Sequence, residues 1–313
     1  MGRLIFYPLF VLTMTVIFKN QLLAYFTESN GFDLSNPLIK ITEIHHGGPA
    51  KDGIPAIDRP HFIKANKAYF LNSTDRILGL SINGVTKAYP IKILNYHEIV
   101  NDFFKNKAVV ITYCPLCGSG IAFSAHINGK DRTFGVSGLL YNSDVLLYDR
   151  ETNSLWSQIL ASAVTGEQSG TPLKMLALTH TPWRDWKKQY PNSLVLSDHL
   201  GFERDYNRSP YGGYTDSQHL YFPVSSLNSR YHPKEKVIGL HLKGIHKVYP
   251  FTELAKVKSP YQDTVAGQKM TLIFNAEKRT GKILDQQQKE IPTTTLFWFA
   301  WMTFYPESLI FNR

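Results

Sequence analysis

Positive charge is nowhere concentrated in this sequence, and several familiar catalytic motifs are missing from it. The 34 lysines and arginines outnumber the 25 acidic residues but never form a run of five or six, which favours a solvated basic surface over nucleic-acid binding. Charged residues make up 19% and hydrophobic residues 43%, which excludes global disorder and allows one large domain or two moderate ones. There is no Gly-x-Ser-x-Gly elbow, phosphate-binding Gly-x-x-x-x-Gly-Lys loop, dinucleotide fingerprint or His-Glu-x-x-His, which excludes the enzyme classes that depend on them.

Long apolar segments are also scarce, because the sequence has only one, at its N-terminus. Met1-Gly2-Arg3 gives a short positive start, and residues 4–18 are almost uninterruptedly apolar. That length suits a signal-peptide core and falls short of the roughly 20 residues that a spanning helix needs. We therefore expect residues 1–24 to be the signal peptide of an exported protein, periplasmic or extracellular. The alternative is an uncleaved anchor in the inner membrane with the protein facing the periplasm, which is the only membrane contact we expect.

The rest of the sequence predicts an α+β fold of mainly antiparallel strands with short helices. Residues 25–75 are rich in glycine and proline turns and poor in periodicity, so we expect an extended lead-in. The pairs Asn83-Gly84 and Asn128-Gly129 suit tight type I′ turns between strands. The predicted elements are hairpins at residues 76–89 and 121–136, a strand at 109–113, and helices at 90–100 and 182–190.

Two parts of the sequence resemble each other in order and spacing. Residues 77–90 recur as residues 237–250, with the glycines and the Tyr-Pro pair at the same positions. Farther on, the Trp-x-x-Trp and Tyr-Pro of residues 183–191 recur in residues 298–306. Two matches in the same order indicate a tandem duplication that gives two related halves. The expected organisation is a lead-in at 25–75, a first repeat at 76–197, a connecting segment at 198–235 and a second repeat at 236–313.

The unusual chemistry is confined to the first repeat, in residues 111–158. This stretch holds both cysteines of the chain, within Cys114-Pro115-Leu116-Cys117-Gly118, together with Asp144, Asp149 and Arg150. In the second repeat Asn275 stands where Cys114 would be, and the other residues have no counterpart. Residues that only built the fold would be needed in both repeats. Their restriction to one repeat favours a functional site.

A Cys-Pro-x-Cys-Gly sequence is typical of a metal knuckle, because its tight turn directs both thiolates to one point. The second cysteine pair of a zinc ribbon is missing, so other ligands or a second subunit must complete the set. We expect His97 to join Cys114 and Cys117. Further candidates are His45, His46, His126 and Asp144. Two thiolates with an imidazole suit zinc or copper, and iron less well.

The same cysteines allow two other interpretations. One is a thioredoxin-type dithiol, for which the context is unfavourable because Gly118-Ser119-Gly120 leads into a strand rather than a helix. The other is a structural disulfide or a pair of buried thiols. The predicted function is therefore an exported metal-binding protein, with or without enzymatic activity. The alternative is a non-enzymatic envelope binding or scaffold protein with a disulfide, and a thiol–disulfide oxidoreductase comes third.

Several polar residues near the cysteines also have two interpretations. Asp144, Asp149 and Arg150 flank the strand-like residues 145–148, either as ion pairs at the strand ends or as catalytic residues that hold a substrate carboxylate or phosphate. His97 lies on the apolar side of its predicted helix, as a satisfied core histidine or as a ligand or acid–base group. The expected partner is a small molecule or a component of the cell envelope.

A set of longer motifs resembles one protein family. The motifs are Gly47-Gly48-Pro49 and residues 51–55, 97–102, 112–118, 134–144, 148–150 and 155–158. With them the chain, from about residue 40 to 254, resembles the bacterial and archaeal family catalogued as domain of unknown function 3179. The resemblance implies no established activity, cofactor or catalytic residue, so it leaves the function open.

Overall fold

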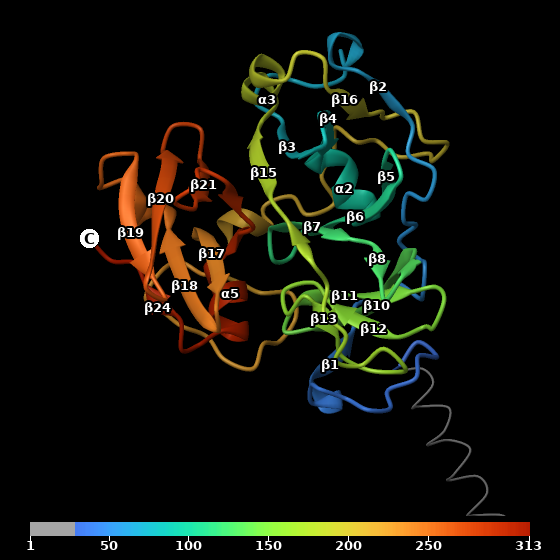
Figure 1. The fold of residues 1–313 in the computed structure, drawn as a ribbon. Helices are drawn as coiled ribbons and strands as arrows, with labels where there is room; N and C mark the ends of the chain where they lie inside the picture. The colour runs from blue at the N-terminus through green and yellow to red at the C-terminus, as the bar shows by residue number, and fades with distance from the viewer. Residues whose placement is uncertain (1–28) are drawn as a thin grey trace, which may run out of the picture.

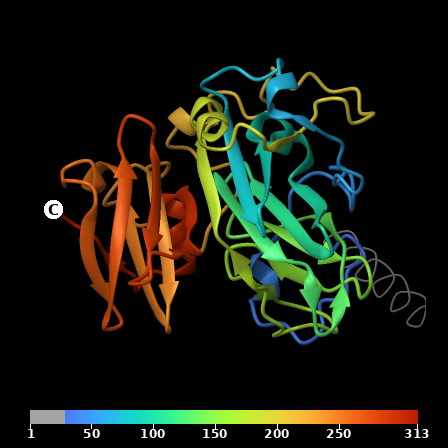
Figure 2. The same cartoon turned by 45° about the horizontal axis from the view of Figure 1, so that its top comes forward.

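The computed structural model describes residues 29–313, so the signal peptide or anchor expected at residues 1–24 lies outside the described part. The described fold is mostly β, with antiparallel-rich sheets and a few short helices, which confirms that part of the predicted fold class. No helix among residues 29–313 is long and apolar enough to cross a membrane. Figures 1 and 2 show two lobes, which we call the first lobe (residues 29–197, blue to yellow) and the second lobe (residues 236–313, orange to red).

One sheet of the first lobe contains the predicted hairpin around Asn83-Gly84. Its order is β15-β3-β4-β16-β2, with strands β2 (Phe62–Lys64), β3 (Arg76–Ile82), β4 (Val85–Pro90), β15 (Leu178–Pro182) and β16 (Leu194–Leu196). Asn83 and Gly84 have φ of +50° and +78°, as a type I′ turn requires. Two short helices accompany this sheet, α2 (Ile91–His97) and α3 (Trp183–Gln189).

A larger sheet joins the two lobes. Its main order is β24-β18-β17-β23-β7-β6-β5, and β14 pairs with β7. Its strands are β5 (Ile99–Phe104), β6 (Lys107–Cys114), β7 (Ser119–Ser124), β14 (Met175–Leu176), β17 (Lys236–Leu242), β18 (Ile245–Pro250), β23 (Thr294–Phe297) and β24 (Leu309–Ile310). The lobes meet where Thr295 of β23 pairs with Gly120 of β7. Their relative position is therefore fixed by backbone pairing as well as by side-chain packing.

Three smaller sheets complete the fold. In the first lobe the order β1-β10-β11-β12-β13 is built from β1 (Ile44–His46), β10 (Phe134–Tyr141), β11 (Asp144–Asp149), β12 (Leu155–Ser157) and β13 (Ser162–Ala163). A two-stranded ladder contains β8 (His126–Ile127) and β9 (Lys130–Asp131). The second lobe has β19 (Tyr261–Val265), β20 (Gln268–Asn275), β21 (Thr280–Leu284) and β22 (Glu290–Ile291) in sequential order.

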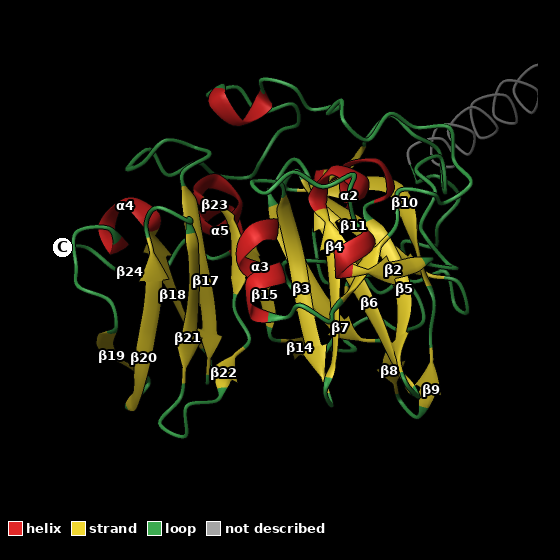
Figure 3. Cartoon of the chain, turned by 90° about the horizontal axis from the view of Figure 1, so that it is seen from above, coloured by secondary structure: helices red, strands yellow, loops and turns green. Residues whose placement is uncertain are grey.

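The remaining elements are short helices. The second lobe has α4 (Phe251–Leu254) and α5 (Trp298–Phe304), and single 3-10 turns occur at η1 (Ile41–Glu43), η2 (Ala65–Lys67) and η3 (Tyr214–Asp216). Figure 3 shows α2, α4 and α5 toward the same end of the strands in the two lobes.

Three predicted elements differ from the structure. The Asn128-Gly129 turn is present, but only the short β8 and β9 pair across it, because β7 pairs with β6 and β10 pairs with β11. The helix predicted at residues 90–100 ends at His97, since Glu98 has φ of +57° and β5 begins at Ile99. The lead-in also contributes edge strands, because β1 pairs with β10 and β2 pairs with β16.

The two lobes repeat one packing motif between a glycine and a tryptophan. A Cβ added at Gly79 would overlap the ring of Trp186, and a Cβ added at Gly239 would overlap the ring of Trp301. The indole N–H groups of these tryptophans donate to Ser193 Oγ at 3.1 Å and to Ser308 Oγ at 2.9 Å. In both lobes the glycine is therefore required by close packing.

Replacing either glycine by alanine is expected to destabilise the protein by about 1–3 kcal/mol, because the buried indole cannot move aside without disturbing its neighbours. We expect Gly79→Ala and Gly239→Ala to have similar effects, measured as free energies of unfolding in urea. Gly212→Ala is the control, since an added Cβ there meets nothing closer than 3.8 Å. Equal stability of all three variants and the parent would contradict this packing.

The largest cluster of buried apolar side chains extends across both lobes. It joins Phe123 and Trp156 of the first lobe to Leu296 and Trp298 of the second lobe. Both cysteines belong to the same cluster, so the Cys-Pro-Leu-Cys turn lies in the interior of the protein.

Candidate metal centre

The two cysteines lie in a tight turn that joins β6 to β7. Cys114 ends β6 and pairs with Ser119, the first residue of β7, which closes the turn. Gly118 within it has φ of +57°, a conformation that favours glycine. Cys114 and Cys117 are 1% and 0% exposed, and both thiols are free. The turn therefore holds two reduced sulfur atoms inside the protein.

A second tight turn faces the sulfur atoms. Asn142 and Ser143 connect β10 to β11, with φ of +53° and +63°. The backbone oxygen of Ser143 accepts hydrogen bonds from both thiols, with S–O distances of 3.7 and 3.3 Å. The side chain of Ser143 donates in turn to the backbone oxygen of Phe222 at 2.9 Å. This turn brings Asp144, the next residue, to the cysteines.

Cys114, Cys117 and Asp144 form a cluster of three metal-ligating side chains. One ligand atom from each lies within 4.8 Å of the others, and all three residues are buried. Oδ2 of Asp144 accepts a hydrogen bond from the backbone N–H of Ile159 at 3.1 Å. Oδ1 is buried and has no hydrogen-bond partner of normal geometry in the described chain. Buried carboxylate oxygens are rarely left without a partner, so Oδ1 is the atom whose environment is incomplete.

The acidic groups of the cluster resist ionisation. Burial raises the pKa of Asp144 to about 8, although backbone N–H groups and the two thiols act in the opposite direction. Burial, and then repulsion from Asp144, raises the pKa of Glu98 to about 8. Burial also raises the thiol pKa of Cys117 well above its usual value. A bound cation would compensate the negative charge of the ionised groups and allow the protons to leave.

Glu98 is placed near the cluster by an unusual backbone conformation. It follows the last residue of α2, and its φ of +57° turns the chain sharply into β5. Its backbone oxygen accepts a hydrogen bond from the N–H of Tyr113 at 2.7 Å, next to Cys114. Nothing in the local sequence pattern singles out Glu98, because its position depends on where the helix stops.

A pocket of about 260 Å³ is lined by sequence neighbours of the cluster, although not by the three cluster residues themselves. Glu98 lines it together with Leu116, which lies between the two cysteines, and Val145, which follows Asp144. Tyr211 and Phe222 line it from the segment that connects the two lobes. The pocket is mostly apolar with one acidic group, which suits a small, largely apolar molecule.

The structure does not bring His97 into the cluster. Its Nδ1 lies 2.8 Å from the backbone oxygen of Pro55, and its Nε2 lies 2.7 Å from the hydroxyl of Tyr206. Burial lowers its pKa, so the neutral form is favoured. His97 is therefore a satisfied core histidine, which was the other interpretation of its sequence, and the third metal-ligating side chain near the two cysteines is that of Asp144.

The other candidate histidines also lie apart from the cluster. His46 contacts Asn30, with 2.8 Å between Nε2 and Oδ1, on an exposed segment. His45 is its neighbour in β1. His126 pairs with Asp131 at 2.7 Å, and both side chains are about half exposed.

Asp149 and Arg150 do not share a site with Asp144, because they lie at the far end of β11. Five residues of extended strand separate the two aspartates by roughly 16 Å. Asp149 is fully buried and bonds Arg132 at 2.9 Å and the indole N–H of Trp156 at 2.8 Å. Arg150 pairs with Asp58 at 2.6 Å near the surface. These contacts match the interpretation as ion pairs at the strand ends.

Comparison with known proteins places the chain in a family. The family model described as "Protein of unknown function (DUF3179)" matches residues 51–290, which include both cysteines, Glu98 and Asp144. No curated protein and no solved structure matched the chain. The match covers well over half of the 313 residues and agrees with the motifs identified in the sequence. The chain therefore belongs to the DUF3179 family, whose function is unknown.

Proposed function

We propose that this protein is an exported metalloprotein that binds one zinc ion through Cys114, Cys117 and Asp144. The observation that carries the proposal is the buried cluster of two thiols and a carboxylate, in which Oδ1 of Asp144 has no hydrogen-bond partner of normal geometry among residues 29–313. Zinc accepts sulfur and oxygen ligands together, whereas calcium and magnesium prefer oxygen alone. Copper is the second metal that this donor set suits, because thiolates also favour Cu(I).

The number of protein ligands supports an enzyme rather than a structural zinc site. Structural zinc is almost always held by four protein ligands, while catalytic zinc has three and an open position. Here the described residues supply three donors, and sequence neighbours of these donors line a pocket. Glu98 lines that pocket, and its pKa of about 8 suits a group that gives or takes a proton near neutral pH. We infer a metal-dependent reaction on a small molecule, with Glu98 as the proton-transfer residue.

The thiol–disulfide oxidoreductase is a weaker alternative. Such enzymes need an accessible cysteine with a lowered pKa, because the thiolate is the attacking group. Cys114 and Cys117 are buried, and the pKa of Cys117 is raised. Both features oppose thiol–disulfide exchange with another protein.

Metal analysis of the full-length protein tests the proposal. We expect about one zinc per chain in protein recovered from the periplasm of a bacterial host, and recovery from that compartment also tests export. Cys114→Ser and Asp144→Asn are expected to reduce the metal to background, while His126→Gln, which removes a surface histidine, should retain it. One copper ion per chain would identify copper as the bound metal and leave the proposed ligands unchanged. No metal, together with a quantitative Cys114–Cys117 disulfide in thiol titration, would favour the scaffold protein instead.

We also infer that the lobes arose by tandem duplication. The strand order supports this inference, because β15-β3-β4-β16 in the first lobe corresponds to β23-β17-β18-β24 in the second lobe. In each set the last two strands are parallel to each other. Lys87 and Tyr89 both bond Asp102, as Lys247 and Tyr249 both bond Asp263. The strands β6 and β20 both have eight residues, and they end at Cys114 and Asn275. These two residues occupy the same position when the sequences of the repeats are aligned. On this inference the second lobe keeps the framework without the metal ligands.

A further inference from the structure

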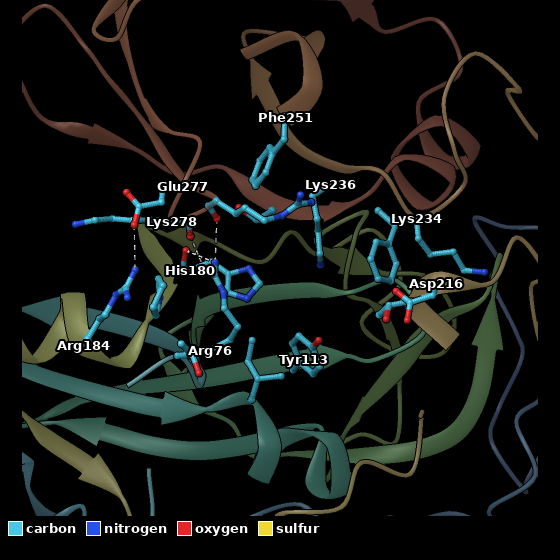
Figure 4. A pocket seen from close by; sticks show the side chains of 17 residues that line it. Arg76, Tyr113, His180, Arg184, Asp216, Lys234, Lys236, Phe251, Glu277 and Lys278 are labelled. Atoms are coloured by element: carbon cyan, nitrogen blue, oxygen red, sulfur yellow. Dashed lines mark hydrogen bonds and ion pairs between the residues drawn. The ribbon is translucent and has the colours of Figure 1, made fainter. Parts of the chain in front are cut away.

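A second pocket, of about 600 Å³, lies between the two lobes, and none of Cys114, Cys117 and Asp144 lines it. The first lobe lines it with Arg76 of β3 and His180 of β15, and the second lobe lines it with Lys236 of β17 and Arg279 of the β20–β21 turn. Figure 4 shows the ring of His180 in the middle of this pocket, with Lys236 beside it. We call it the interlobe pocket.

Positive charge dominates the interlobe pocket. The cationic residues that line it are Arg76, Arg184, Lys234, Lys236, Lys278 and Arg279, whereas Asp216 and Glu277 are its only acidic lining residues. Lys278 is paired with Asp185 at 2.6 Å, and Arg184 lies 3.5 Å from Glu277. Within residues 29–313, Arg76, Lys236 and Arg279 have no carboxylate within ion-pair distance. Lys234 has none either, so four of the lining cations have no ion-pair partner in the described chain.

Backbone oxygens bind the charged groups of Arg76 and Lys236 without neutralising them. The guanidinium of Arg76 donates to the backbone oxygens of Lys278, His180 and Arg279 at 2.7, 2.8 and 3.1 Å. Nζ of Lys236 donates to the backbone oxygen of Gly118 at 2.9 Å. Burial, with repulsion from Arg76 and Arg279, lowers the pKa of Lys236 to about 7. The positive charges of the pocket therefore repel one another.

His180 supplies an independent sign of a missing ligand. The residue is only 8% exposed, and neither ring nitrogen has a hydrogen-bond partner in the described chain. A neutral imidazole has one N–H donor and one acceptor nitrogen, and both are normally satisfied when the ring is buried. An acceptor atom in the pocket would satisfy the N–H of His180.

We propose that the interlobe pocket binds the oxyanion group, phosphate or carboxylate, of a small ligand through Arg76, His180, Lys236 and Arg279. An oxyanion supplies both features that the pocket lacks, negative charge and hydrogen-bond acceptors, and arginine's planar fork suits phosphate and carboxylate. The volume is that of a small-molecule site, and Phe251 and Phe297 provide apolar walls for the rest of the ligand. Each lobe contributes cations, so binding bridges the lobes.

Calorimetric titration of the full-length protein with inorganic phosphate and, separately, with citrate tests this site. We expect saturable binding of one ion per chain at 150 mM NaCl. Lys236→Met is expected to weaken binding at least tenfold, because it keeps the apolar stem and removes the charge. Lys130→Met, on the exposed β9, is the matched control and should bind like the parent. His180→Gln provides a second variant, since the His180 side chain makes no hydrogen bond that the fold needs.

The two probes separate the chemical sources of the anion. Saturable binding of phosphate alone assigns a phosphate group, and binding of citrate alone assigns a carboxylate. Thermal melting of each variant confirms that it is folded. The proposal is overturned if the parent binds neither ion saturably, or if folded Lys236→Met and His180→Gln bind as tightly as Lys130→Met. Phosphate and citrate are themselves zinc ligands, so the titrations use protein freed of metal by a chelator, and saturable binding measured there is independent of the metal centre.

Discussion

Removing zinc from the full-length protein with a chelator is expected to lower its thermal unfolding midpoint by roughly 8–16 °C. A ligand that binds only the native state at about a thousand times its Kd stabilises that state by about 4 kcal/mol. One kcal/mol shifts the midpoint of a domain of 150–250 residues by about 2–4 °C. The three donors come from the β6–β7 turn and from β11, so they converge only in the folded chain. Differential scanning calorimetry with and without chelator measures the shift.

The difference in thermal unfolding midpoint between the zinc-bound and the metal-free protein is expected to increase with pH. Burial holds the pKa of Asp144 at about 8 in the metal-free protein, well above its ordinary value of 3.8. A raised carboxyl pKa favours the folded state only while the proton is bound, so the metal-free protein loses stability from about pH 4 to pH 8. With zinc bound, the carboxylate would already be ionised and its charge compensated by the metal. The midpoint difference should therefore be larger at pH 8 than at pH 5.5.

Two variants test whether the shift in unfolding midpoint comes from metal bound by Cys114, Cys117 and Asp144. In Asp144→Asn the chelator should change the midpoint by no more than a few degrees, because the carboxylate ligand is gone. In His126→Gln the full shift should remain, since that histidine pairs with Asp131 on the surface. Identical midpoints for the parent protein with and without chelator would contradict the metal centre.

Local sequence patterns predicted the parts of this centre that depend on neighbouring residues. The Cys-Pro-Leu-Cys-Gly sequence predicted a turn that directs both sulfurs to one point, and the structure has that turn between β6 and β7. That prediction rests on short-range geometry, in which glycine and proline restrict the backbone directly.

The third ligand and the second pocket depend on long-range pairing. We expected His97 to join the cysteines, with a core histidine as the other interpretation of its position on the helix, but α2 ends there and directs the ring toward Pro55 and Tyr206. Asp144 reaches the sulfurs only because the β10–β11 turn packs against the cysteine turn, which no local pattern encodes. The interlobe pocket depends on the pairing of β23 with β7, between residues far apart in the chain.

Replacing Asp149 by asparagine is expected to destabilise the protein by about 3–5 kcal/mol, a large part of the 5–15 kcal/mol by which a typical domain is stable. The Arg132 and Asp149 side chains are 7% and 0% exposed, so the substitution leaves the guanidinium buried without its counter-charge. It also disturbs the bonds that Asp149 accepts from Trp156 and from the N–H and hydroxyl of Thr152. Equilibrium unfolding in urea measures the loss.

Asp131→Asn is the control for Asp149→Asn, because it removes a carboxylate from an ion pair whose partner, His126, is about half exposed. Water screens such a pair, so the expected cost is below about 1 kcal/mol. The zinc content of folded Asp149→Asn should remain at one per chain, since Asp149 lies at the opposite end of β11 from Asp144. An Asp149→Asn variant that keeps full stability but loses its zinc would instead make Asp149 part of the metal centre. The free energy of unfolding and the zinc content together show whether Asp149 stabilises the fold or binds the metal.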